Sequence, residues 1–253
     1  MSRMFACVVA VLVACPSAVI GQVNTERMRA LDVEGVRTTL GSDVAVQAGN
    51  VDLFEIGAAG RVDVRQAPHS AFLVTQLRYG VKDNESFRDR TFGHLRYNYR
   101  LLPSLVAEGF TQLERDGFAR LRLRVLAGGG LRIQYLNTET LKIFQGTTPM
   151  YEHEVLDAGA DDVATALSTL RWSNYLNVRL RLTEATRLMG TVYVQPRMDA
   201  FEDVRVLHQS TLAVQVTEHV NLTIEVDLRY DSRPPAEIED LDLTLRNGVE
   251  VSF

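Results

Sequence analysis

The feature that most restricts the fold is a strict alternation of apolar and polar side chains near the carboxyl end of the chain. From Val220 to Asp231, every second residue is apolar and the residues between them are polar. Successive side chains of a β-strand point to opposite faces, so this strand has one apolar and one polar face. A tilted strand needs roughly 9–11 residues to cross a membrane, and this stretch is long enough. The pattern therefore predicts a membrane-spanning strand of a β-barrel.

Alternation of this kind recurs along the chain and predicts twelve strands. Their expected ranges are 37–48, 52–65, 70–81, 91–102, 105–114, 118–134, 138–150, 165–182, 186–195, 204–216, 220–231 and 241–253. Short and long connections mostly alternate between these ranges, as periplasmic turns and extracellular loops do in outer-membrane barrels. The connections at 49–50 and 115–117 are exceptions, because they are short where long ones are expected. We expect an all-β fold, a single antiparallel transmembrane β-barrel of about twelve strands in an up-and-down meander.

The composition excludes several other classes of protein. Hydrophobic residues make up 46% of the chain and charged residues 23%, which is typical of a folded protein and not of a disordered one. The net charge of −5 argues against a nucleic-acid-binding protein. Beyond the start of the chain, no apolar run approaches the roughly 20 residues of a membrane-spanning helix, which excludes a helical transporter.

The first 21 residues have the layout of a secretory signal peptide. A positive charge is followed by an apolar stretch, and Gly21 is the small residue after which we expect cleavage. Residues 22–253 would then form one barrel domain. The segment ending at Cys15 also resembles a bacterial lipobox, so lipidation of Cys15 stays an alternative. Cleavage after Gly21 would remove both cysteines, Cys7 and Cys15, from the mature chain.

Five segments of the mature chain carry a family resemblance. They are 23–26 (VNTE), 92–100 (FGHLRYNYR), 128–132 (GGGLR), 228–235 (LRYDSRPP) and 249–253 (VEVSF). In these segments the chain resembles the DUF481 family, whose members are described as salt-induced outer membrane proteins. The resemblance implies an outer-membrane β-barrel in a Gram-negative envelope. It implies no established activity, cofactor or catalytic residue.

The last predicted strand ends in an aromatic residue. Val249, Val251 and Phe253 share its apolar face. Such a strand resembles the sorting signal of outer-membrane barrels, which is recognised by addition of the strand to another sheet. The expected partners are therefore outer-membrane lipid and, during biogenesis, the barrel-assembly machinery and periplasmic chaperones. We expect a monomer in the cell outer membrane that binds no nucleic acid.

The polar faces of the predicted strands are rich in arginine and would line the barrel interior. Lysine occurs only at positions 82 and 142, so all but two of the 27 basic residues are arginine. The expected lumen-lining residues are Arg96, Arg100, Glu108, Glu114, Arg120, Arg122, Arg124, Arg179 and Arg181. Two interpretations stay open. Arginine–carboxylate pairs could fill and stiffen the barrel as an envelope-structural protein, or the arginines could line a narrow pore that prefers anions.

A lipid-modifying barrel enzyme is the alternative from a different class. His208 and Ser210 share one face of a predicted strand, but neighbours two residues apart lie too far apart for a catalytic hydrogen bond. The chain has no G-x-S-x-G motif. The acidic segment 152–162 has oxygen ligands for a divalent cation, although a solvated surface loop is the simpler interpretation. Glycines 128–130 predict a bend or close packing in the barrel wall. We expect no enzymatic activity, no metal site and no cofactor.

Overall fold

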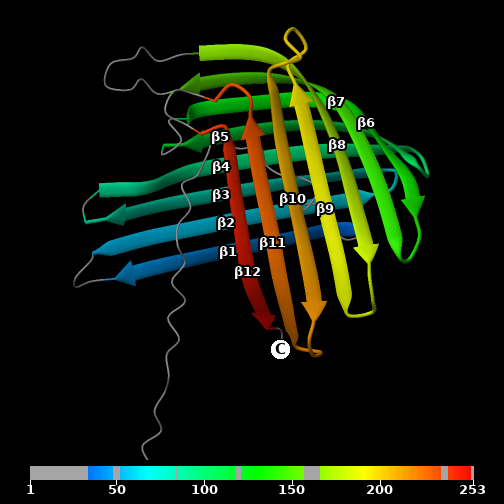
Figure 1. Ribbon diagram of the computed structural model, residues 1–253, viewed down its shortest axis with the longest axis horizontal. Helices are drawn as coiled ribbons and strands as arrows, with labels where there is room; N and C mark the ends of the chain where they lie inside the picture. The colour runs from blue at the N-terminus through cyan, green and yellow to red at the C-terminus, as the bar shows by residue number, and fades with distance from the viewer. Residues whose placement is uncertain are drawn as a thin grey trace, which may run out of the picture.

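The computed structural model describes residues 34–47, 52–83, 85–117, 121–156, 166–234 and 239–251. They form one antiparallel sheet of 12 strands, in which each strand pairs with its neighbours in sequence (Figure 1). The strands are β1 Gly35–Gln47, β2 Leu53–Gln66, β3 His69–Lys82, β4 Glu85–Leu102, β5 Leu105–Asp116, β6 Leu121–Asn137, β7 Leu141–Leu156, β8 Ala166–Arg181, β9 Thr186–Pro196, β10 Val204–Gln215, β11 Val220–Asp231 and β12 Leu241–Val251. The predicted all-β meander and its strand order are confirmed. The signal peptide predicted for residues 1–21 lies outside the described residues.

Two strands are longer than their sequence pattern indicates. β4 already begins at Glu85, inside a predicted loop, and β7 continues to Leu156, so Glu152 and Glu154 lie in a strand rather than in an acidic loop. In each extension an inward-facing charged side chain is ion-paired, as with Arg90 of β4 and Glu114 of β5, and with Glu152 of β7 and Arg124 of β6. In the sequence, a charged strand end resembles a loop, because the sequence does not show which residue of another strand pairs with the charge.

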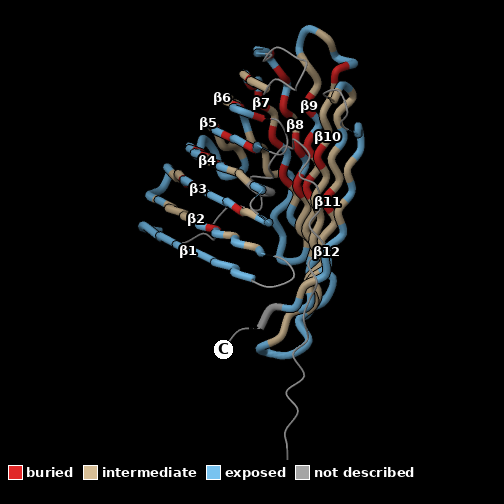
Figure 2. Tube along the Cα trace, turned by 90° about the vertical axis from the view of Figure 1, so that its left-hand side faces the viewer, coloured by how far each residue is buried: buried red, intermediate tan, exposed pale blue. Residues whose placement is uncertain are grey.

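The sheet is strongly rolled but not closed. β1 to β5 run across β8 to β12, while β6 and β7 connect the two halves (Figures 1 and 2). Among the described residues no pairing joins β1 to β12, so the pairing that would complete the predicted barrel is not made. β1 is consequently exposed along its whole length. The connections from β7 to β8, from β9 to β10 and from β11 to β12 are the long ones, and they lie at one end of the strands, here named the loop end. The short β1–β2, β3–β4 and β5–β6 connections lie at this end too. The opposite end, where every connection is short, is named the turn end.

The two faces of the sheet differ as the alternation predicts. In β4, His94 and Arg96 are buried on the inner face, whereas Leu95 and Tyr97 on the outer face are 45% and 46% exposed. The buried positions lie where the two halves of the sheet face each other (Figure 2). Within the described ranges, no helix has the length and apolar character that crossing a membrane requires.

Two glycines allow close packing on the inner face. A Cβ atom at Gly130 would overlap the carbonyl oxygen of Thr147, and one at Gly146 would overlap the ring of Tyr175 on the neighbouring strand. The Tyr175 side chain thereby reaches across the sheet interior, and its hydroxyl donates a hydrogen bond to Glu108 Oε2 at 3.1 Å. Close packing therefore accounts for glycine at position 130, within the predicted 128–130 segment.

Candidate functional site

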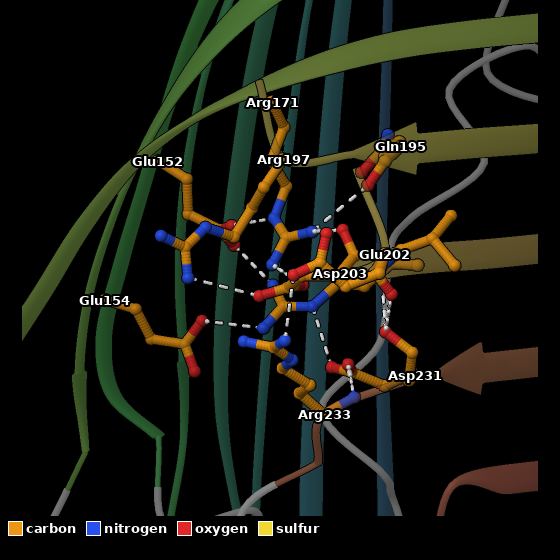
Figure 3. A network of polar contacts seen from close by, with 12 residues as sticks. Glu152, Glu154, Arg171, Gln195, Arg197, Glu202, Asp203, Asp231 and Arg233 are labelled. Atoms are coloured by element: carbon orange, nitrogen blue, oxygen red, sulfur yellow. Dashed lines mark hydrogen bonds and ion pairs between the residues drawn. The ribbon is translucent and has the colours of Figure 1, made fainter. Parts of the chain in front are cut away.

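The inner face carries a connected set of buried charges near the loop end (Figure 3). Its central acid is Glu152 of β7, whose carboxylate contacts three arginines from three other strands. Arg124 of β6 lies at 3.2 Å, Arg171 of β8 at 2.7 Å and Arg205 of β10 at 2.6 Å. Because β7 and β10 are not neighbours in the sheet, the contact with Arg205 bridges the interior.

Each of these arginines also contacts a second carboxylate at 2.7–2.9 Å. The pairs are Arg124–Glu154, Arg171–Asp203 and Arg205–Asp231. We call the seven residues the interior ion-pair network: Arg124, Arg171, Arg205, Glu152, Glu154, Asp203 and Asp231. A charge taken out of water is tolerated only when opposite charges and hydrogen bonds compensate it. The network meets that condition for all three arginines.

Strand register explains how the chain assembles this network. Arg124 lies directly opposite Glu154 across β6 and β7, and Arg205 lies opposite Asp231 across β10 and β11. Directly opposed residues of an antiparallel pair project from the same face, so opposite charges at these positions meet. Asp203 comes from the β9–β10 connection, which therefore folds over the sheet interior.

The same connection carries a more exposed ion pair. Arg197 contacts Asp199 at 2.7 Å and Asp203 at 3.2 Å, which ties the connection to the network. The side-chain hydrogen bonds from Arg197 hold the pKa of Asp199 below its usual range. The same contacts raise the pKa of Arg197 above its ordinary value, with the Asp199 hydrogen bond as the largest cause.

A second buried acid lies closer to the turn end. Glu108 of β5 contacts Arg96 of β4 at 3.1 Å, and Arg132 of β6 lies 3.9 Å from its other oxygen. The Tyr175 hydroxyl donates to the same carboxylate from β8. Glu108 thus connects the two halves of the sheet at a level below the network.

Beyond Glu108 the interior widens into a cavity of about 530 Å³ at the turn end, here named the turn-end cavity. Two acidic side chains, Glu34 and Asp63, lie in its wall. Six basic side chains lie there too: Arg37, Arg65, Arg100, Arg132, Lys142 and Arg179. The rings of Phe72 and Phe144 form part of its apolar surface. The cavity therefore combines an excess of positive charge with a few apolar contacts.

The predicted lumen-lining residues are distributed over several environments. Those that are buried and ion-paired are Arg96, Glu108, Glu114 and Arg124. Those that line the turn-end cavity are Arg100 and Arg179. Those that are exposed are Arg122 and Arg181, the latter 3.3 Å from Glu139, while Arg120 lies outside the described residues.

Arg122 separates from Arg124 because the register of β6 shifts between Leu121 and Leu123. A local irregularity of this kind breaks the alternation that assigned both arginines to one face. Of the predicted assembly signal, Val249 is exposed on the outer face of β12, and Phe253 lies outside the described residues.

Glu152 and Glu154 were missed because they lie in a segment that resembled a loop, and Asp203 because it lies in a connection between predicted strands; Asp231 ends the predicted strand 220–231 but was not named as an interior residue. Glu152 and Asp203 are polar residues at the ends of strand patterns, where alternation no longer predicts the face on which a residue lies. The signal that could have found Glu152 and Glu154 is the two-residue spacing itself, continued past Met150. In the described part of the chain, no group of acidic, histidine or cysteine side chains is arranged to hold a metal ion, and Asp157, Asp161 and Asp162 lie outside that part.

The outer face holds a serine–histidine contact that the sequence pattern did not indicate. His153 Nδ1 of β7 lies 2.8 Å from Ser168 Oγ of β8, and the Tyr151 hydroxyl donates to the same oxygen at 3.1 Å. By contrast, no hydrogen bond among those described joins His208 and Ser210. Histidine and serine meet here because they lie opposite each other on neighbouring strands.

Comparisons with known proteins give a family match and a match among solved structures. The sequence profile described as "Protein of unknown function, DUF481" matches residues 41–253. No curated protein matches the chain. Among solved structures, a NanC porin determined in a rhombohedral crystal form matches with a TM-score of 0.48 and 10% sequence identity. The match covers 85% of this chain and 99% of the porin chain.

Proposed function

Since this chain belongs to the DUF481 family, a family of proteins of unknown function, we propose that it is an outer-membrane β-barrel with a structural role in the envelope. Its wall is apolar outside and charged inside, which is the arrangement of a barrel in lipid. The interior ion-pair network fills its loop end. The barrel therefore stiffens the membrane wall and passes little solute.

The proposal includes closure of the sheet by pairing of β1 with β12. Unpaired backbone N–H and C=O groups are costly in hydrocarbon, because no water is present to bind them. β1 and β12 are the two edges left in the described sheet. An even number of alternating strands makes these edges antiparallel, so they can join without a change in strand direction.

The observation that carries the structural role is the contact of Glu152 with arginines of β6, β8 and β10. The contact with Arg205 links β7 to β10, which is not its neighbour in the sheet. Each arginine has a second carboxylate, so little uncompensated charge is left to attract an ion at this level. A barrel obstructed by such pairs differs from an open pore, whose wall charges face water.

Single-channel recording in planar bilayers tests this role. The folded parent protein should show no stable open conductance. The double variant Arg171→Ala/Arg205→Ala, which removes two arginines that reach into the interior, should show brief currents. A steady conductance of the parent protein would overturn the structural role and favour the narrow, anion-preferring pore instead.

One observation favours a second function, lipid modification by a barrel enzyme. The contact of Ser168 with His153 places a hydroxyl and a base within reach on the outer face, as nucleophilic catalysis requires. The experiment is release of fatty acid from phospholipid in mixed micelles. Hydrolysis by the parent protein that is lost in Ser168→Ala but kept in Ser210→Ala would establish this function.

We further propose that the barrel is a monomer surrounded by outer-membrane lipid. During biogenesis, periplasmic chaperones deliver the chain to the barrel-assembly machinery, which binds β12. Support comes from the free edge of β12, which is open to strand addition. Val249→Asp, on the outer face of this strand, should lower the amount of protein in the outer-membrane fraction. Thr244→Asn, a polar replacement on its inner face, is the control and should leave that amount unchanged.

A further inference from the structure

We propose that the turn-end cavity is a binding site for a small multivalent oxyanion, a molecule that carries phosphate or several carboxylate groups. The proposal goes beyond the structural role, and only its orientation toward the periplasm rests on the proposed placement in the membrane. It is carried by three properties of the cavity wall: its charge balance, the convergence of its basic side chains, and its size.

The charge of the cavity is unbalanced because its two acids are already engaged. Glu34 contacts Arg65 at 3.2 Å, and Asp63 contacts Arg61 at 2.6 Å. In the described part of the chain, no carboxylate lies within ion-pair distance of three basic residues of the wall, Arg37, Arg100 and Lys142. The wall therefore keeps several positive charges for which the described chain supplies no partner.

These basic side chains converge because of strand register. Lys142 lies directly opposite Arg179 across β7 and β8, and like charges in that position destabilise a sheet. Arg100 of β4 lies opposite Val106, which in turn lies opposite Arg132 of β6. One row of the inner face thus points two arginines at the cavity from β4 and β6, and Lys142 faces it from β7. An anion between them would relieve their repulsion.

The loop end of the same interior makes the contrast plain. There, Arg124, Arg171 and Arg205 each contact at least two carboxylates, and no arginine of the network lacks compensation. At the turn end, basic side chains outnumber the acidic ones, and Arg37, Arg100 and Lys142 have no carboxylate within ion-pair distance in the described chain. A fold that needed charge only for stiffness would pair both ends alike, so the unbalanced end indicates a ligand that supplies the missing negative charge.

The chemistry of the wall fits phosphate and carboxylate groups. Guanidinium groups bind both in a two-pronged geometry, and Lys142 adds a point charge. Arg132 is held over the Phe144 ring at 3.9 Å, which restricts its position before a ligand arrives. Small-molecule sites commonly span about 300–1,000 Å³. The cavity of about 530 Å³ falls in this range, so it accommodates a metabolite-sized anion.

The test is calorimetric titration of the full barrel, folded in neutral detergent at low salt, with sodium pyrophosphate. We expect one saturable site. The variant Arg100→Gln/Lys142→Gln should bind at least tenfold more weakly. Arg122→Gln is the matched control, because Arg122 is, like Arg100, an exposed arginine without an ion-pair partner in the described chain, but it lies near the loop end, away from the cavity. It should bind as the parent does.

Two results would overturn the proposal. One is absence of saturable binding to parent protein whose β-sheet circular dichroism is intact. The other is equal weakening by Arg122→Gln, which would mean diffuse attraction to a charged surface. Titration in phosphatidylcholine nanodiscs with and without phosphatidylglycerol separates two sources of the anion. Competition by phosphatidylglycerol supports the site with a lipid headgroup as occupant, and its absence supports the site with a soluble ligand. Neither arm depends on the conductance measurement.

Discussion

Replacement of Glu152 by glutamine removes the charge that three buried arginines share. The Glu152 carboxylate contacts Arg124, Arg171 and Arg205 at 3.2, 2.7 and 2.6 Å. Removing one partner of a buried ion pair typically costs about 3–5 kcal/mol, because it leaves a charge without compensation. Glutamine keeps the volume and one oxygen acceptor, and every arginine keeps a second carboxylate. We therefore expect a loss of about 3 kcal/mol in the free energy of unfolding, the lower end of that range.

The assay is unfolding by urea in lipid vesicles, followed by the fluorescence of Trp172, the only tryptophan of the chain. Glu139→Gln is the matched control, since the Glu139 side chain is 90% exposed and pairs with Arg181 at 3.3 Å. An exposed pair of this kind contributes about 0–1 kcal/mol. A loss for Glu152→Gln no greater than that of the control would refute the reasoning that the network is buried and shared.

A double variant adds a check on the coupling between the two residues. Glu152→Gln and Arg205→Gln each leave a partner without its closest opposite charge. The combined variant removes both charges of the 2.6 Å contact, so its loss should be smaller than the sum of the single losses. Strict additivity would show that the contact bridging the interior does not form in the membrane.

Three further predictions concern the wall of the barrel. Ile224→Arg, on the outer face of β11, should cost about 2–4 kcal/mol in vesicles, whereas Thr223→Arg on the inner face should be tolerated; equal losses would contradict the assigned faces. A peptide tag inserted after Asp161 should bind antibody on intact cells, and a tag after Pro103, between β4 and β5, should not; the reverse pattern would invert the topology. Gly146→Val should lower the unfolding midpoint because its side chain overlaps the Tyr175 ring, and an unchanged midpoint would show that the ring is free to move.

The architecture was predictable from the sequence because it depends on a local, periodic property. Each strand must present one apolar face to its surroundings, so every second residue of a strand is apolar. In Val220–Asp231 this spacing is strict, and the predicted and observed bounds of the strand agree. The rolled sheet without a β1–β12 pairing was not predictable in this way. β1 contains two glycines and few large side chains, so its pattern places it in the sheet but does not fix its second neighbour.

The interior was harder to predict, because its contacts join strands that are distant in sequence. Alternation placed Arg96, Glu108 and Arg124 on one face, and in the structure these side chains are buried and ion-paired, yet alternation gave no information on which acid meets which base. It also grouped Arg122 with Arg124, whereas Arg122 is exposed beside a register shift of β6, which alternation does not reveal. The role of Glu152 could not be predicted from alternation, because its contact with Arg205 of β10 forms only through the curvature of the whole sheet.

The meander has a consequence for how such barrels diverge. Every strand pairs only with its neighbours in sequence, so gene duplication of one hairpin adds two strands without any rethreading of the chain. Added strands widen the circumference of the barrel, and the barrel tolerates them where they do not separate residues that must form an ion pair across the interior. Insertion between β6 and β10 would pull Glu152 away from Arg205, whereas insertion near β2 would leave that contact intact. We therefore expect relatives of different girth to vary in the first hairpins of the chain and to keep the segment from β6 to β10 constant in length.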